Sequence, residues 1–277
     1  MGHDTFQVGD LTAVIGDNEA YGGHRAGYNG VHQLTHRAEA STLFVPSVGG
    51  LNFEHIFDGE QEFDDPKIFF EPRNAPMEFK RLADDEAELH QLRTPTFFLE
   101  SWTRFKLVPP HYIDFTFRFR PAQHCFRNGY IGLFWANYIN APEDKSMYFR
   151  GARAWQQICS PEHNNQSTLR HRDDKIELKF RPGSRETLFK NLSPLRYDEP
   201  FFYGHYRNQL FLMMFDRAEG VRLTHSPSGG GPNAPLQTTN AAWDFQFILP
   251  AYEVLHDYSF RARAVYRERS SREEVLK

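Results

Sequence analysis

The segment HYIDFTFRFR, residues 111–120, decides the fold class of this chain. Its apolar side chains, Ile113, Phe115, Phe117 and Phe119, alternate one by one with polar side chains. Successive side chains of a β-strand point to opposite faces of a sheet. The alternation therefore predicts a strand with one buried face and one exposed face.

Similar runs extend in both directions from this segment. The run FFLESWTRFKLV before it ends at the break Pro109–Pro110, which predicts a second long strand and a tight connection. The run RLADDEAELH has a turn signal between two alternating halves and predicts a hairpin. Helical periodicity is scarce, with the short GARAWQQICS region and the charged tail as the exceptions. The other predicted strands are residues 11–16, 31–36, 42–46, 67–71, 77–82, 87–92, 130–139, 175–180, 209–215, 221–225, 243–249 and 258–266.

Aromatic content supports the same class. Of the 277 residues, 15% are aromatic, with 26 Phe and 12 Tyr, and such rings pack well on a pleated surface. So many strands must bury their apolar faces against one another, which predicts an all-β fold, a large sandwich of two antiparallel sheets. We expect one β-sandwich domain over residues 1–267, followed by a charged C-terminal tail over residues 268–277.

Charge and cysteine content exclude several classes of protein. The formal net charge is −4 with mixed signs, so we expect no nucleic-acid partner. The beginning MGHDTFQVGD lacks signal-peptide features, and no segment offers about 20 consecutive apolar residues, so we expect a cytoplasmic protein without membrane contact. Cys125 and Cys159 lie far apart, which argues against a disulfide framework and against a thiolate metal site.

Two sets of segments carry a resemblance to known proteins. The opening GGHRAGYNGVHQLTH with TLFVP resembles the first strands of the galactose mutarotase-like supersandwich proteins, among them aldose epimerases, polysaccharide lyases and accessory domains of glycoside hydrolases. LFVP with GLNFEHIFDG, and LTHSPSGGG with WDFQ, are similar to segments of a group of bacterial carbohydrate-associated proteins. The resemblance implies a supersandwich fold and a role in carbohydrate metabolism.

No nucleotide-binding loop, HExxH, GxSxG or EF-hand pattern occurs, so the candidate site residues come from polar clusters near turns. In residues 21–37, YGGHRAGYNGVHQLTHR, four glycines permit tight turns that would bring His24, Arg25 and Tyr28 into a pocket. Packing within the loop is the alternative.

Two further clusters place a carboxylate next to an imidazole, a combination that transfers protons near neutral pH. In GLNFEHIFDG, Glu54 and His55 are adjacent on a strand, so we expect them to point to opposite faces and only His55 to face a site. In SPEHNNQ, Glu162 and His163 lie among turn-forming residues, and an ordinary exposed loop is equally compatible with this pattern. The predicted catalytic residues are His24, His55, Glu162 and His163.

The predicted substrate-binding groups are an arginine and several aromatic rings. Arg73 suits bidentate recognition of a carboxylate or of vicinal hydroxyls, with an internal salt bridge to Glu71 as the alternative. Tryptophans can stack on sugar rings, although a core role is commoner for them. A long glycine-rich loop, residues 226–240, precedes Trp243, and loops of this kind are often functional. The predicted substrate-binding residues are Arg25, Tyr28, Arg73, Trp135, Trp243 and Asp244.

Three functions remain open from the sequence. The first is an enzyme that acts on a sugar or glycoside, of epimerase, lyase or hydrolase type, by acid–base catalysis in a concave pocket. The second is a non-catalytic carbohydrate-binding module or accessory subunit, and the third is a structural or oligomer-forming β-protein. The expected partner is a small sugar or oligosaccharide, and self-association to a homo-oligomer is left open. No cofactor and no metal ligand are predicted, although thirteen histidines leave room for a divalent metal ion.

Overall fold

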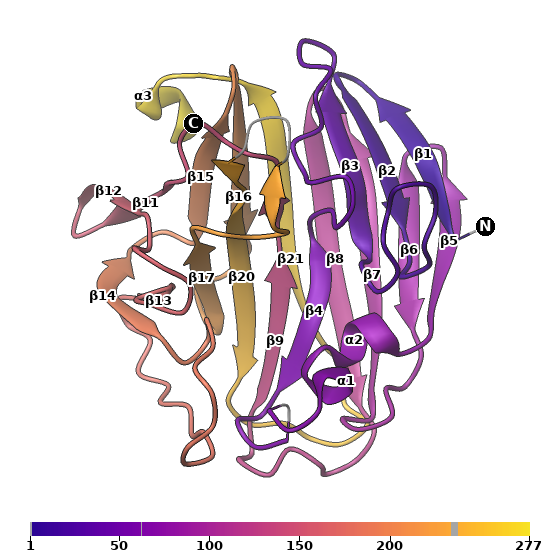
Figure 1. The fold of residues 1–277 in the computed structure, drawn as a ribbon, viewed down its shortest axis with the longest axis vertical. Coiled ribbons are helices and arrows are strands. Elements are labelled where there is room, and N and C mark those ends of the chain that lie inside the picture. The colour runs from indigo at the N-terminus through magenta and orange to yellow at the C-terminus, as the bar shows by residue number, and fades with distance from the viewer. Residues whose placement is uncertain (1, 62, 234–237) are drawn as a thin grey trace.

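The alternating segments pair into two large sheets that lie face to face, as Figure 1 shows. The structure is a computed structural model and describes residues 2–61, 63–233 and 238–277. The predicted all-β, two-sheet sandwich is therefore confirmed.

The larger sheet has nine antiparallel strands in the described part of the chain. In spatial order they are β12 (Ala154–Ile158), β11 (Met147–Gly151), β15 (Phe201–Tyr206), β16 (Gln209–Phe215), β21 (Tyr258–Glu268), β8 (Tyr112–Pro121), β7 (Leu99–Val108), β6 (Glu86–Gln91) and β5 (Met77–Ala83).

The smaller sheet has seven strands within the described ranges, and its neighbours are antiparallel except for the parallel pair β13 and β14. In spatial order they are β14 (Leu192–Tyr197), β13 (Thr168–His171), β17 (Val221–Ser226), β20 (Ala241–Leu249), β9 (Ile131–Ala136) and β4 (Asn52–Phe57), with β10 (Tyr138–Ile139) paired to β20.

A third, three-stranded sheet comprises β1 (His3–Val8), β2 (Leu11–Gly16) and β3 (Gly30–His36), and its first strand contacts β5 and β7. The two-residue strands β18 (Pro232–Asn233) and β19 (Thr238–Thr239) pair within the glycine-rich loop. Residues 234–237 of this predicted loop lie outside the described residues.

The core fills the space between the two large sheets. The four apolar side chains of residues 111–120 are at most 1% exposed, as their alternation predicts. Opposite them, Trp135 of β9 stacks on Phe245 of β20 with 5.0 Å between ring centroids, and Phe117 of β8 meets Trp135 edge-on at 4.7 Å. These contacts join the sheets through aromatic rings that lie far apart in sequence.

A second aromatic layer covers the outer face of the smaller sheet. Strand alternation sends Trp135 and Phe245 inward, while Phe134 of β9 and Ile248 of β20 point outward. Phe189, from the loop between β13 and β14, packs in the same outer layer. The candidate site lies on this outer face.

Two short helices, α1 (Pro66–Phe69) and α2 (Glu71–Asn74), lie in front of one end of β4 (Figure 1). The predicted strand over residues 67–71 is therefore wrong. Asp65 caps α1 by accepting a hydrogen bond from the backbone N–H of Lys67 at 2.8 Å, and Pro66 occupies the first helical turn. Both residues favour a helix start over a continued strand.

Three further sequence predictions differ from the structure. Residues 42–46 contribute an isolated bridge between Phe44 and Ile139 rather than a strand. Residues 175–180 alternate in burial because Ile176 and Phe180 pack on the outer layer, but their backbone forms no sheet ladder. Part of the helix-like GARAWQQICS region forms β12, which pairs with β11.

Candidate functional site

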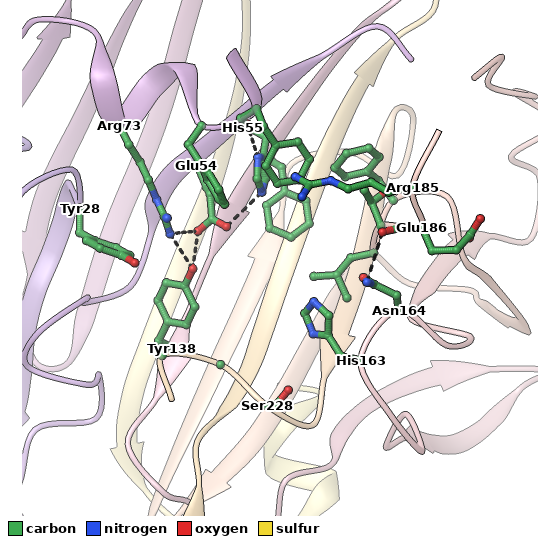
Figure 2. Close-up of a pocket in the computed structure, with 18 residues that line it drawn as sticks. Tyr28, Glu54, His55, Arg73, Tyr138, His163, Asn164, Arg185, Glu186 and Ser228 are labelled. Carbon is green, nitrogen blue, oxygen red and sulfur yellow. Dashed lines mark hydrogen bonds and ion pairs between the residues drawn. The ribbon is translucent and has the colours of Figure 1, made fainter. Parts of the chain in front are cut away.

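A cavity of about 510 Å³ opens on the outer face of the smaller sheet. Its walls come from β4, β9, β10, the two short helices and four loops, so the fold gathers segments that are far apart in sequence (Figure 2). The lining residues are Tyr28, Glu54, His55, Phe69, Phe70, Arg73, Phe134, Tyr138, His163, Asn164, Arg185, Glu186, Thr187, Leu188, Phe189, Ser228, Gly229 and Gly230.

An irregularity in β4 places two adjacent polar side chains in this pocket. The register between β4 and β9 shifts between Phe53 and His55, so Glu54 is the extra residue of a β-bulge. Phe53 and Ile56 both pack in the core between the sheets, while Glu54 and His55 both line the pocket. A bulge redirects side chains in this way and is common beside active sites.

Glu54 is the centre of a hydrogen-bonded cluster, as the dashed lines of Figure 2 show. One carboxylate oxygen, Oε2, accepts hydrogen bonds from Nη2 of Arg73 at 2.6 Å, from the hydroxyl of Tyr138 at 2.5 Å and from the Asn52 amide at 3.1 Å. The other oxygen, Oε1, lies 3.0 Å from Nε2 of His55. Four polar groups of the described residues thus contact the buried anion, three at Oε2 and one at Oε1.

These contacts fix the charge state of the cluster. Burial alone would raise the pKa of Glu54, but the Arg73 guanidinium and His55 outweigh it and lower the pKa to about 2. Burial raises the pKa of the Tyr138 phenol well above its usual value, so the hydroxyl stays protonated. It donates a hydrogen bond to Glu54. Burial opposes the charge of Arg73, but Glu54 raises the pKa of the guanidinium above its ordinary value.

His55 has no ring nitrogen left for a substrate. Its Nδ1 lies 2.5 Å from the carbonyl oxygen of Phe69, which only accepts, so Nδ1 carries a proton. Its Nε2 faces the ionised Glu54, which also only accepts. His55 therefore orients Glu54 from a buried position.

His163 differs because, within the described ranges, only one of its ring nitrogens forms a hydrogen bond. The hydroxyl of Ser226 donates to the carbonyl oxygen of Ser228 at 2.7 Å, so it accepts from Nδ1 of His163 at 2.8 Å. His163 is exposed as a whole, but partial desolvation of its ring lowers the pKa of His163 more than the charge of Glu54 raises it, which favours the neutral ring near pH 7. In Figure 2 the second ring nitrogen, Nε2, turns toward the Glu54 side of the pocket and carries a lone pair.

Aromatic rings and a second arginine complete the walls. The Arg73 guanidinium lies 3.9 Å above the Tyr28 ring, and Tyr28 meets Tyr138 edge-on at 6.0 Å. Arg185 enters from the opposite loop, with its guanidinium 3.9 Å above the ring of Phe69. Among the described residues the pocket therefore offers apolar ring faces, a buried carboxylate, two guanidinium groups and one imidazole nitrogen without a hydrogen bond.

Comparisons with known proteins place this architecture. No sequence-family model and no curated protein matches the chain. Among solved structures, a protein from Escherichia coli K12 described as an aldose 1-epimerase superposes with a TM-score of 0.57 and 9% identity, over 96% of this chain and 99% of that one. A protein from Synechocystis sp. PCC 6803 gives a TM-score of 0.54 at 12% identity, over 96% of each chain.

This chain has the galactose mutarotase-like fold. Part of a larger enzyme shares it, because a heparan sulfate lyase mutant from Pedobacter heparinus superposes with a TM-score of 0.53 and 9% identity, over 98% of this chain but 36% of the lyase.

Four of the predicted site residues line the pocket: Tyr28, His55, Arg73 and His163. Arg73 forms its ion pair with Glu54 rather than with Glu71, the alternative considered from the sequence. The start of the glycine-rich loop, at Ser228, also lines the pocket, as its composition indicates.

The other predicted loop residues lie outside the pocket. His24 is buried, and its two ring nitrogens face the carbonyl oxygens of Pro46 at 3.1 Å and Tyr28 at 2.8 Å, so its role is to hold the loop. Arg25 is exposed, with its guanidinium 5.4 Å from the Tyr28 ring. Glu162 is exposed and accepts a hydrogen bond from the Asn165 side chain at 3.1 Å.

The two tryptophans and Asp244 do not line the pocket, the tryptophans because of strand alternation and Asp244 because it is covered on the outer face. Trp135 and Trp243 are fully buried in the core between the sheets, so neither ring face is open to a sugar. Asp244 points to the other face but is also buried, where one carboxyl oxygen accepts from the backbone N–H of Asn137 at 2.8 Å. Burial raises the pKa of Asp244 well above its usual value.

Sequence reasoning missed several polar residues of the pocket, among them Glu54, Tyr138 and Arg185. It placed Glu54 on the face opposite His55, because strict alternation takes no account of the bulge. It did not single out Tyr138, whose phenol completes the Glu54 cluster, or Arg185 in the loop between β13 and β14. The signal for Tyr138 was weak, because one tyrosine in the strand-like run YIGLFWANYI has nothing to distinguish it.

Two further features bear on cofactors and membranes. Over residues 2–61, 63–233 and 238–277, no group of three or more His, Cys, Asp or Glu side chains is arranged to hold a metal ion. Within the same ranges no helix has the length and apolar character needed to cross a bilayer.

Proposed function

We propose that this protein is an enzyme that acts on a sugar or glycoside by acid–base catalysis in the pocket. The observation that carries the proposal is His163, whose Nδ1 is held by Ser226 while its Nε2, on the side of the pocket that faces Glu54, has no hydrogen bond to any described residue. A neutral imidazole with a lowered pKa accepts a proton near pH 7 and returns it later in the reaction.

Glu54 has a different role in this proposal. A carboxyl group with a pKa of about 2 is a weak base, so Glu54 stays ionised through the reaction. Its Oε1 has a single described partner, His55, and retains a lone pair that can accept a sugar hydroxyl or stabilise positive charge that develops on the ring. Arg73 and Tyr138 hold the carboxylate in place for that task.

The apolar walls suit the C–H faces of a sugar ring. Tyr28, Phe70 and Phe134 line the same cavity, and aromatic rings provide rigid apolar contact area. The similarity in fold to proteins described as an aldose 1-epimerase and a heparan sulfate lyase supports activity on carbohydrate. Epimerase, lyase and hydrolase chemistry are the reaction types to test.

The first experiment is a thermal-shift screen against neutral monosaccharides, uronates, sugar phosphates, disaccharides and divalent cations, with and without chelator. A ligand present at one hundred times its dissociation constant adds about 2.7 kcal/mol to stability, which gives a clear rise in midpoint. A midpoint that no sugar raises would count against a carbohydrate site.

The second experiment separates an enzyme from a non-catalytic binding module. Sugars selected by the screen are followed by polarimetry for epimerisation, by reducing-end release for hydrolysis and by absorbance of an unsaturated product for elimination. In an enzyme, His163→Gln abolishes turnover and leaves sugar affinity largely intact, whereas a binding module shows no turnover in any assay.

A further inference from the structure

Arg185 is a cation of the pocket without an anionic partner. Its guanidinium stacks 3.9 Å above the ring of Phe69, and in the described part of the chain it forms no ion pair. A guanidinium stacked on a ring still presents its N–H groups along its edge, where they are free to bind another group.

The loop that carries Arg185 is held in place on both sides. The ammonium group of Lys190 donates to the carbonyl oxygens of Ser184 at 2.8 Å and of Arg185 itself at 3.0 Å. The amide of Asn164, from the His163 loop, donates to the carbonyl oxygen of Glu186 at 3.3 Å. The position of Arg185 over the pocket is therefore built by the fold.

The neighbouring acid does not neutralise Arg185. The carboxylate of Glu186 pairs with Lys190 at 3.2 Å and accepts from Asn191 at 2.8 Å. Figure 2 shows the Glu186 side chain extending away from the pocket while Arg185 extends over the aromatic rings toward His55.

The remaining charges of the pocket leave a positive excess. Glu54 is the one buried anion among the described lining residues, and its charge is already matched by Arg73. His55 also contacts this carboxylate, so Glu54 does not neutralise Arg185.

We infer that the substrate is an anionic sugar and that Arg185 is the residue that selects it, by binding a carboxylate, sulfate or phosphate group. This inference rests on the proposed function of the same pocket. A planar guanidinium forms two parallel hydrogen bonds with any of these anions, and the ring of Phe69 holds its plane fixed. Arg185 is thus a specificity-determining residue, whereas proton transfer remains with His163.

The test compares each anionic sugar with its neutral parent by calorimetric titration. The probes are glucuronate, glucose 6-sulfate and glucose 6-phosphate against glucose, galacturonate against galactose, and inorganic phosphate alone. We expect anionic sugars to bind at least tenfold more tightly than their neutral parents, with an affinity that falls as salt rises. The three anion types identify which charged group fits.

Variants assign the effect to the residue. Arg185→Gln should weaken the anionic sugar by roughly 10- to 100-fold, the range expected for losing hydrogen bonds to a charged group, and leave the neutral parent unchanged. Arg185→Lys should give an intermediate loss of affinity for the anionic sugar, because lysine keeps the positive charge but lacks the paired N–H donors of the guanidinium. Arg93→Gln is the matched control, since Arg93 is an exposed arginine outside the pocket.

The outcomes separate this inference from the proposed function. If neutral and anionic sugars bind equally and Arg185→Gln changes neither, the inference fails and the proposed function stands. If phosphate binds through Arg185 but no sugar binds, the anion site stands and the proposed function fails. If nothing binds, both fail. Should Arg185→Gln not fold, a salt-independent affinity of the wild-type protein for the anionic sugar would overturn the inference.

Discussion

This protein has two groups of histidines that differ in what surrounds them. In the pocket, His55 and His163 lie near a buried carboxylate and a free cavity. In the opening segment, His24 stacks on His32 at 3.7 Å, next to the ring of Tyr21, and both histidines are buried. The opening segment is the richer in histidine, yet none of its histidines lines the pocket.

The difference lies in what each ring nitrogen contacts. Both nitrogens of His24 face backbone carbonyl oxygens. Burial, with a smaller contribution from the charge of His24, lowers the pKa of His32 to about 3, so His32 stays neutral at physiological pH. His163 uses a single nitrogen for anchoring and keeps the other for the pocket. A histidine is suited to catalysis when one nitrogen is fixed and the other is open.

The largest expected effect tests this contrast directly. His163→Ala should lower turnover of the sugar selected by the screen by about 100- to 10,000-fold while the protein stays folded, because the proton acceptor is lost. His24→Gln should lower the melting temperature and leave kcat nearly unchanged. Steady-state kinetics and thermal melts on both variants provide the check, and an equal loss of kcat in the two folded proteins would contradict the distinction.

The next effect concerns Glu54, the buried carboxylate of the pocket. Glu54→Gln leaves Arg73 buried without its anion, which should reduce the free energy of unfolding by about 3–5 kcal/mol. Urea denaturation at pH 7 measures the change. Asp257→Asn, which breaks the exposed pair of Asp257 with Arg120, is the control and should cost much less. A comparable loss of stability in both variants would show that burial of the Glu54–Arg73 pair does not increase its effect on the free energy of unfolding.

A pH series tests the opening group. The pKa of His32 is lower in the folded protein than in the unfolded chain, so the unfolded chain takes up a proton first as pH falls below about 6.5. Stability should then fall by about 1.4 kcal/mol per pH unit from this residue, down to its folded pKa of about 3. His225, whose pKa burial lowers to about 4, adds a loss of the same sign.

The measurement is urea unfolding at pH 6.5 and pH 5.0, above the range in which Glu54 takes up protons. Over this interval His32→Asn should lose about 2 kcal/mol less than the wild-type protein, because one of the titrating groups has been removed. An unchanged pH dependence in the variant would mean that His32 is not held neutral by its burial.

The smallest expected effect sharpens the role of the His163 anchor. Ser226→Ala removes one hydrogen bond to Nδ1, worth about 0.5–1.5 kcal/mol, so turnover should fall by roughly 2- to 10-fold. The pH profile of kcat/KM should also shift, since the tautomer of His163 is no longer fixed. A normal profile with an unchanged rate would show that Ser226 does not position this ring.

Much of the fold follows from local pattern. Residues 209–215 form β16 as predicted, and the alternation at residues 111–120 gave both the strand and its buried face. The strand predicted over residues 67–71 is wrong because the helix start at Asp65 and Pro66 outweighs the β-favouring composition of these residues. The strand predicted over residues 175–180 is wrong because burial also alternates where a loop lies across an aromatic layer. The backbone of such a loop need not pair with a strand.

The candidate site could be predicted only in part. Side-chain chemistry drew attention to Arg73, His55 and His163, all of which reach the pocket. It could not separate them from His24 or Trp243, because burial and hydrogen-bond partners are set by segments distant in the chain. Tyr138 and Arg185 become recognisable only when their neighbours are known.

The sequence by itself determined the β class, the two-layer sandwich and most strand positions, because the period-two alternation of apolar side chains is a local property. The tertiary structure alone decided which polar residues meet. The bulge that turns Glu54 to the same side as His55 depends on the register between β4 and β9. Such a register arises from pairing between distant segments, and no local periodicity records it.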